Sequence, residues 1–120
     1  MCKVYGYCRV ALESKEEIAE QMRAIAKCCG DNNLKVYGFF CDDGVSGLDI
    51  GPELKHLLGE VREGDTVVVK DLSRLARSNA KLLMYMDQFE NMGVKILCAD
   101  DDSEYHVPSM AKWFEERWAR

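Results

Sequence analysis

Two arginines, Arg74 and Arg77, follow a run of three valines at residues 67–69. The valines are typical of a buried strand, and the polar residues after them predict a sharp turn. At this spacing on a helical turn the two guanidinium groups share a face and can reach one target. A guanidinium matches phosphate oxygens with a planar fork of donors. The pattern indicates a phosphate site, although the exposed start of an amphipathic helix would give the same spacing.

The elements around this pair alternate between strand and helix. Strands are expected over residues 3–10, 34–41, 67–69 and 94–99, where β-branched and aromatic residues gather. A capping box, Ser14 with Glu17, opens a first helix that ends near residue 30. Further helices are expected from Pro52, over residues 82–93 with Ser78 as the cap, and from Pro108. Polar loops are expected at residues 42–47 and 100–103.

This order predicts an α/β fold with three layers, in which helices cover both faces of a mainly parallel sheet of four or five strands. Ligands of such sheets bind outside the carboxyl ends of the strands. Arg9 lies at the end of the first expected strand, and Arg74 and Arg77 follow the third. The topology therefore places all three arginines on one rim, which favours a site that handles phosphate.

Composition narrows the class of protein. The 120 residues suit one domain over residues 1–120, and 48% hydrophobic with 31% charged residues is typical of a soluble globular chain. No apolar run approaches the roughly 20 residues of a membrane span, and the N-terminus does not resemble a signal peptide. Six cysteines without a C-x-x-C pair read as reduced thiols of a cytoplasmic protein, and no zinc site is expected. The net charge of −5 argues against a general DNA-coating surface.

Four stretches together resemble the serine site-specific recombinases, the resolvase/invertase superfamily. Tyr7, Arg9 and Val10 are similar to that family's Tyr-x-Arg-Val-Ser opening, and residues 42–47 resemble its Asp-x-x-x-Ser-Gly loop with Ser46 at the serine. Residues 62–77 are similar to its glycine-aspartate strand followed by Arg-Leu-x-Arg. Residues 115–120 resemble a stretch of the large transposon- and phage-borne branch. The resemblance covers the whole chain in the right order.

The resemblance implies a catalytic domain that cleaves and rejoins DNA. In that family a serine attacks a DNA phosphodiester and forms a 5′-phosphoserine link, without a metal or another cofactor. By position, Arg9, Arg74 and Arg77 would bind the scissile phosphate, and Ser46 would support the site by hydrogen bonding. The partners implied are DNA and further copies in a homodimer or homotetramer, with no membrane. A DNA-binding region would follow residue 120, and the last helix would begin a dimerisation helix.

Three positions depart from the family pattern. Ala11 stands at the nucleophile position, and its methyl group cannot attack phosphorus. Gly51 stands where the family places an arginine before a helix start, and Ser73 stands where many members carry aspartate. Ser14 could be a substitute nucleophile, but its capping box explains it as a helix cap. The sequence therefore predicts a recombinase domain that cannot form the covalent link.

Other readings of the chain stay open. One is a non-catalytic partner that pairs with active recombinases or occupies their DNA sites; Gly51 favours this interpretation, whereas Ala11 does not discriminate. A metal-dependent phosphoryl-transfer module could use Asp100 and Asp102 with magnesium, but Arg9 stands where such a site needs a carboxylate. The same residue argues against a receiver-type phosphoacceptor domain. A cysteine phosphatase loop and a dinucleotide-binding fingerprint are both absent from the sequence.

Overall fold

Strands and helices alternate in the computed structural model, which describes residues 2–45, 51–71, 80–100 and 103–105. The elements in chain order are β1 (Val4–Val10), α1 (Lys15–Asp31), β2 (Val36–Asp43), α2 (Pro52–Glu60), β3 (Thr66–Val69), α4 (Ala80–Asn91), β4 (Lys95–Cys98) and β5 (Ser103–Tyr105). This is the predicted order of the first four strands and three helices. The helix expected from Pro108 and the cap expected at Ser78 lie outside the described residues.

The strands form one sheet in the order β2-β1-β3-β4-β5. The first three contacts in this order are parallel, and β5 pairs antiparallel with β4. The predicted mainly parallel sheet is confirmed. One detail was wrong: Ser103, expected in a polar loop, begins β5. This strand has only three residues, too few for an alternating pattern to be recognised.

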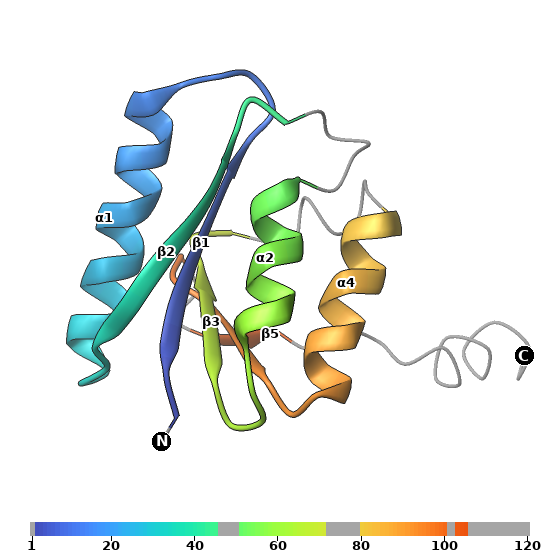
Figure 1. Cartoon of the computed structure of the whole chain (residues 1–120). Helices are drawn as coiled ribbons and strands as arrows, with labels where there is room; N and C mark the ends of the chain where they lie inside the picture. Colours follow the sequence, from blue (N-terminus) through green and yellow to red (C-terminus); the bar gives the residue numbers. More distant parts are fainter. Residues whose placement is uncertain (1, 46–50, 72–79, 101–102, 106–120) are drawn as a thin grey trace, which may run out of the picture.

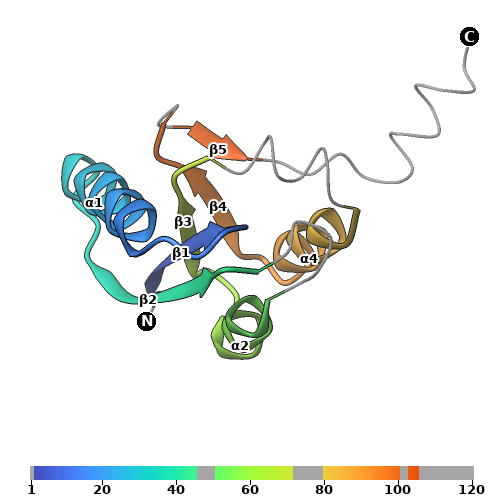
Figure 2. The same cartoon turned by 90° about the horizontal axis from the view of Figure 1, so that it is seen from above.

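Helices cover both faces of the sheet, as predicted. Helix α1 lies on one face, and α2 and α4 lie side by side on the other (Figures 1 and 2). All seven residues of β1 are buried, because β1 has a neighbour on each side and helices on both faces. Successive side chains of a strand point to opposite faces. Tyr5 and Tyr7 thus join the core beneath α2 and α4, while Cys8 and Val10 join the core beneath α1.

Two features of the described residues lie at the carboxyl edge of the sheet: the cap of α1 and the end of β2. Ser14 caps α1 as predicted, since its Oγ accepts a hydrogen bond from Glu17 N at 3.2 Å. Strand β2 extends two residues beyond the predicted end, so Asp42 and Asp43 belong to the strand and not to the loop. They stay in register with the last two residues of β1. The longer strand carries an aspartate into the interior.

All six cysteines are free thiols, four of them buried, and burial raises the pKa of the Cys29 thiol. Among the residues that the structure describes, no helix is long and apolar enough to cross a membrane.

Candidate active site

Arg9 lies at the carboxyl edge of the sheet, next to the last residue of β1. It is paired in register with Asp42 of β2, and only 6% of its surface is exposed. By strand alternation its side chain leaves the sheet on the same side as Tyr7. Arg9 Nη1 donates a hydrogen bond to Tyr7 Oη at 3.4 Å. The arginine is thus held by a buried polar partner on the face that α2 and α4 cover.

Tyr7 joins this arginine to a buried carboxylate. Its hydroxyl donates to Asp42 Oδ2 at 2.8 Å. Burial is the main cause that raises the pKa of Tyr7 far above its usual value, and the negative charge of Asp42 adds to it, while Arg9 opposes it. Tyr7 therefore remains a neutral donor to Asp42 at any physiological pH.

Asp42 caps helix α2 from a neighbouring strand. Asp42 is 2% exposed, and its carboxylate accepts hydrogen bonds from Glu53 N at 3.0 Å and Leu54 N at 3.1 Å. These amides belong to the first turn of α2, where helical N–H groups lack partners and a negative charge is favoured. Gly51 occupies the N-cap position but has no side chain to supply such a bond. Asp42 performs the capping that residue 51 cannot.

Gly51 is buried directly against this carboxylate. A Cβ atom added at residue 51 would overlap Cγ and both oxygens of Asp42. The backbone at Gly51 is ordinary extended chain, with φ −71° and ψ 155°, so the glycine is needed for space and not for conformation. Position 51, which the resemblance assigns to an arginine, cannot carry any side chain while Asp42 keeps this place.

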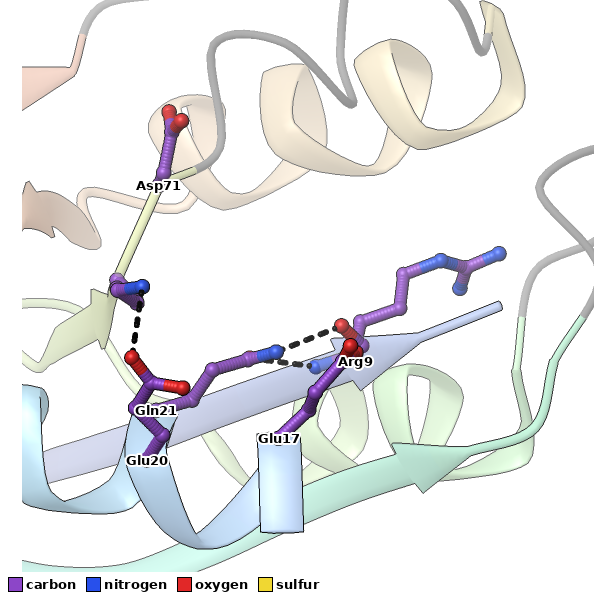
Figure 3. A pocket seen from close by; sticks show the side chains of 6 residues that line it. Arg9, Glu17, Glu20, Gln21 and Asp71 are labelled. Atoms are coloured by element: carbon purple, nitrogen blue, oxygen red, sulfur yellow. Dashed lines mark hydrogen bonds and ion pairs between the residues drawn. The ribbon is translucent and has the colours of Figure 1, made fainter. Parts of the chain in front are cut away.

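Gln21 of α1 holds the backbone of Arg9 from the other face of the sheet. Gln21 Oε1 accepts from Arg9 N, and Gln21 Nε2 donates to Arg9 O, both at 3.0 Å (Figure 3). Gln21 was not among the residues that the sequence patterns singled out. The sequence did contain one indication: Gln21 is a polar residue one helical turn from Ile18 and from Ile25, the buried isoleucines of α1. Together with Tyr7, Gln21 fixes Arg9 from both sides.

Ala11 follows β1 directly and is exposed at the carboxyl edge. The chain on either side of it is tied to the end of β2. Gly44 N and Val45 N donate to Val10 O at 3.0 and 3.1 Å, and Ser14 N donates to Asp43 Oδ1 at 2.8 Å. Residue 11 is therefore presented to solvent on a constrained loop, two positions after Arg9. The hydroxyl of Ser14 is engaged in capping α1, which fits its reading as a structural serine.

A hollow of about 290 Å³ lies on the α1 side of this edge. It is lined by three carboxylates, by Arg9 and Gln21, and by Lys70, whose Nζ lies 3.9 Å from Glu20 Oε1. Figure 3 shows that the guanidinium of Arg9 points away from Glu17 and Gln21, toward the opposite side of β1. Its acidic lining makes this hollow unfavourable for a phosphate. Among the described residues, no three His, Cys, Asp or Glu side chains are placed so that they could hold a metal ion together.

Comparison with known proteins decides the family. Residues 4–116 match the family model described as the resolvase N-terminal domain. The chain belongs to the resolvase family. A resolvase/recombinase of Pseudomonas putida is 35% identical over 100 residues, which are 82% of this chain and 52% of that protein. The transposon Tn3 resolvase of Escherichia coli is 30% identical over 99 residues, covering 82% of this chain and 51% of the relative.

Solved structures agree on the fold of this resolvase domain. The N-terminal catalytic domain of TP901-1 integrase superimposes with a TM-score of 0.69 at 24% identity, over 93% of this chain and 87% of the other. A resolvase family site-specific recombinase from Streptococcus pneumoniae gives 0.68 at 23% identity, over 99% and 86%. The chain spans about half the length of the curated relatives it matches. Membership of the family, predicted from four sequence stretches, is confirmed.

Four of the predicted positions in this resolvase domain stay predictions. Ser46, Ser73, Arg74 and Arg77 lie outside the described residues. The strands that lead toward them are well placed, since Ala99 N donates to Val69 O at 2.7 Å and Asp100 N to Lys70 O at 3.0 Å. The ends of β3 and β4 therefore reach the same edge as Arg9.

Proposed function

We propose that this chain is the catalytic domain of a DNA site-specific serine recombinase in which phosphate binding is retained and DNA cleavage is lost. The observation that carries the proposal is the position of Ala11. It is exposed at the carboxyl edge, two residues after a buried arginine that Tyr7 and Gln21 hold in place. A resolvase serine at this place would meet a phosphate bound at the edge, whereas a methyl group has no lone pair to attack phosphorus.

Arg9 would carry the binding of one DNA phosphate. Its charge is permanent, and its low exposure strengthens attraction to an anion because little water screens it. Arg74 and Arg77, carried over from the family pattern, would complete the site, and Ser46 would donate a hydrogen bond to it. Arginines held in advance around a phosphate supply electrostatic stabilisation that would otherwise need a metal. With a serine at residue 11, the attack would break the phosphate's 3′-oxygen bond and leave a 3′-hydroxyl.

A second candidate is a non-catalytic partner of active recombinases. Its support is the packing of Gly51, since Asp42 fills the space that an arginine at this position would need. The change at residue 51 is thus built into the interior, which is expected of a chain adapted to a role without cleavage. Under either candidate we propose DNA as the partner, assembly into a homodimer or homotetramer on it, and action in the cytoplasm, where its free thiols stay reduced.

Removing the Arg9 charge is expected to weaken DNA binding. In Arg9→Ala we expect the affinity for a short duplex to fall about five- to fiftyfold at low salt, independently of sequence, with the salt slope reduced by about one. Fluorescence anisotropy at several salt concentrations measures both quantities. Arg9→Lys, which keeps the charge, should lose less.

The matched control is Arg23→Ala. Arg23 is an exposed arginine on α1, and its loss should leave the salt slope unchanged. Circular dichroism establishes that each variant is folded. Equal affinities and equal slopes for the unaltered chain, Arg9→Ala and Arg23→Ala would remove Arg9 from the site.

A further inference from the structure

We propose that Asp42 is a positioning residue that sets the orientation of Arg9 through Tyr7, and that Gly51 is required for this role. The inference rests on the proposed function, because it concerns how Arg9 is presented to a phosphate. The resemblance gave Asp42 a place in a motif but no contact. The contacts come from three separate elements: β1, β2 and the start of α2.

A tyrosine hydroxyl has a single hydrogen to donate. Tyr7 donates it to Asp42 Oδ2 at 2.8 Å, so only lone pairs of the oxygen remain for other neighbours. Arg9 Nη1, which can only donate, lies 3.4 Å from Tyr7 Oη. As long as Asp42 is an acceptor, Tyr7 is locked as an acceptor toward Arg9.

Asp42 itself is held rigidly by its hydrogen bonds. One oxygen accepts from Glu53 N, and the other accepts from both Leu54 N and Tyr7 Oη. Asp42 is buried, so water cannot replace these partners without opening the fold. The first turn of α2 therefore fixes Asp42, Asp42 fixes Tyr7, and Tyr7 fixes one side of the Arg9 guanidinium.

Residue 51 has to be a glycine for Asp42 to keep its place. Any side chain there would push the carboxylate away from α2, because its Cβ would occupy the same space. The amides of Glu53 and Leu54 would lose their acceptor, and Tyr7 would lose the partner that orients its hydroxyl. A glycine at residue 51 thus keeps the whole arrangement in place, and a side chain at this position would alter Arg9 without touching it.

A double-mutant cycle tests the coupling. We expect Tyr7→Phe and Asp42→Asn each to lower affinity for a short duplex about three- to tenfold, and the double variant to be no weaker than the weaker single variant. Tyr7→Phe should lower the melting temperature less than Asp42→Asn does, because it keeps both hydrogen bonds from the α2 backbone to the Asp42 carboxylate. Tyr37→Phe, which removes the hydroxyl of an exposed tyrosine, is the control and should leave the affinity unchanged.

Two further comparisons separate the role of Asp42 from that of Arg9. Gly51→Ala should reproduce the loss of affinity seen in Tyr7→Phe, and it replaces Asp42→Asn in the comparison should that variant not fold. In Arg9→Ala the Tyr7→Phe change should have no further effect. Additive losses in the cycle, or full affinity in Tyr7→Phe and Gly51→Ala, would overturn the inference while leaving Arg9 as a phosphate ligand. Full affinity in Arg9→Ala would instead refute the proposed function.

Discussion

Replacing Gly51 by arginine should destabilise the domain by about 2–5 kcal/mol, because the new side chain must displace a buried carboxylate. The Cβ atom alone would overlap Asp42. Moving Asp42 would leave the amides of Glu53 and Leu54 without their present acceptor and would bring a buried charge out of its hydrogen bonds. Urea denaturation of Gly51→Arg against the unaltered chain measures the loss.

Gly59→Arg is the matched control for this change. Gly59 is an exposed residue of the same helix, and a Cβ added there meets no atom within 4 Å. Its replacement should stabilise the helix slightly, since glycine is a poor helix former. In an Asp42→Ala background the Gly51→Arg change should cost less than it does alone, because the clash is gone. Unaltered stability of Gly51→Arg would show that Asp42 can leave its place freely.

The second large effect that we expect is a gain of covalent reactivity toward DNA. Ala11→Ser is expected to produce a covalent protein–DNA product where the unaltered chain gives none, because it restores a hydroxyl on the exposed loop beside Arg9. The assay uses the full-length protein with duplexes selected from genomic DNA by binding, and denaturing gels detect the adduct. Ala11→Ser combined with Arg9→Ala should lose the product, since the phosphate is no longer held.

Leu12→Ser provides the control for Ala11→Ser. Leu12 is the next residue and is 84% exposed, so it offers an equally accessible hydroxyl at the wrong position. It should form no adduct. The Ala11→Ser, Gly51→Arg double variant should give less adduct than Ala11→Ser alone, because a side chain at residue 51 displaces Asp42. DNA binding without an adduct in every serine variant would favour the second candidate, a non-catalytic partner.

Local patterns predicted the scaffold of this domain well. The alternation of strands and helices specified a parallel sheet, and a parallel sheet brings the ends of its strands to one edge. Arg9 could therefore be assigned to the rim from its place at the end of β1. The capping box at Ser14 was equally local, because its two groups lie three residues apart.

The contacts that tune the site could not be predicted in this way. Asp42 accepts from a tyrosine 35 residues earlier and from amides 11 and 12 residues later. No spacing rule joins such positions before the fold is known. Gly51 consequently read as the loss of an arginine, whereas the structure shows it as a packing requirement. One signal was present: a helix that starts at Gly51-Pro52 lacks a capping side chain, so an acceptor from elsewhere is required.

We expect the Arg9 guanidinium to contact a DNA phosphate at this edge of the sheet. The most direct measurement is an NMR titration that follows the Nε–Hε signals of ¹⁵N-labelled arginine while a short duplex is added, with Arg9→Lys and Arg23→Lys used for assignment. We predict that the Arg9 signal shifts in a saturable, salt-sensitive manner and that the signal of exposed Arg23 does not. An Arg9 signal that stays unchanged while DNA binds would contradict the account.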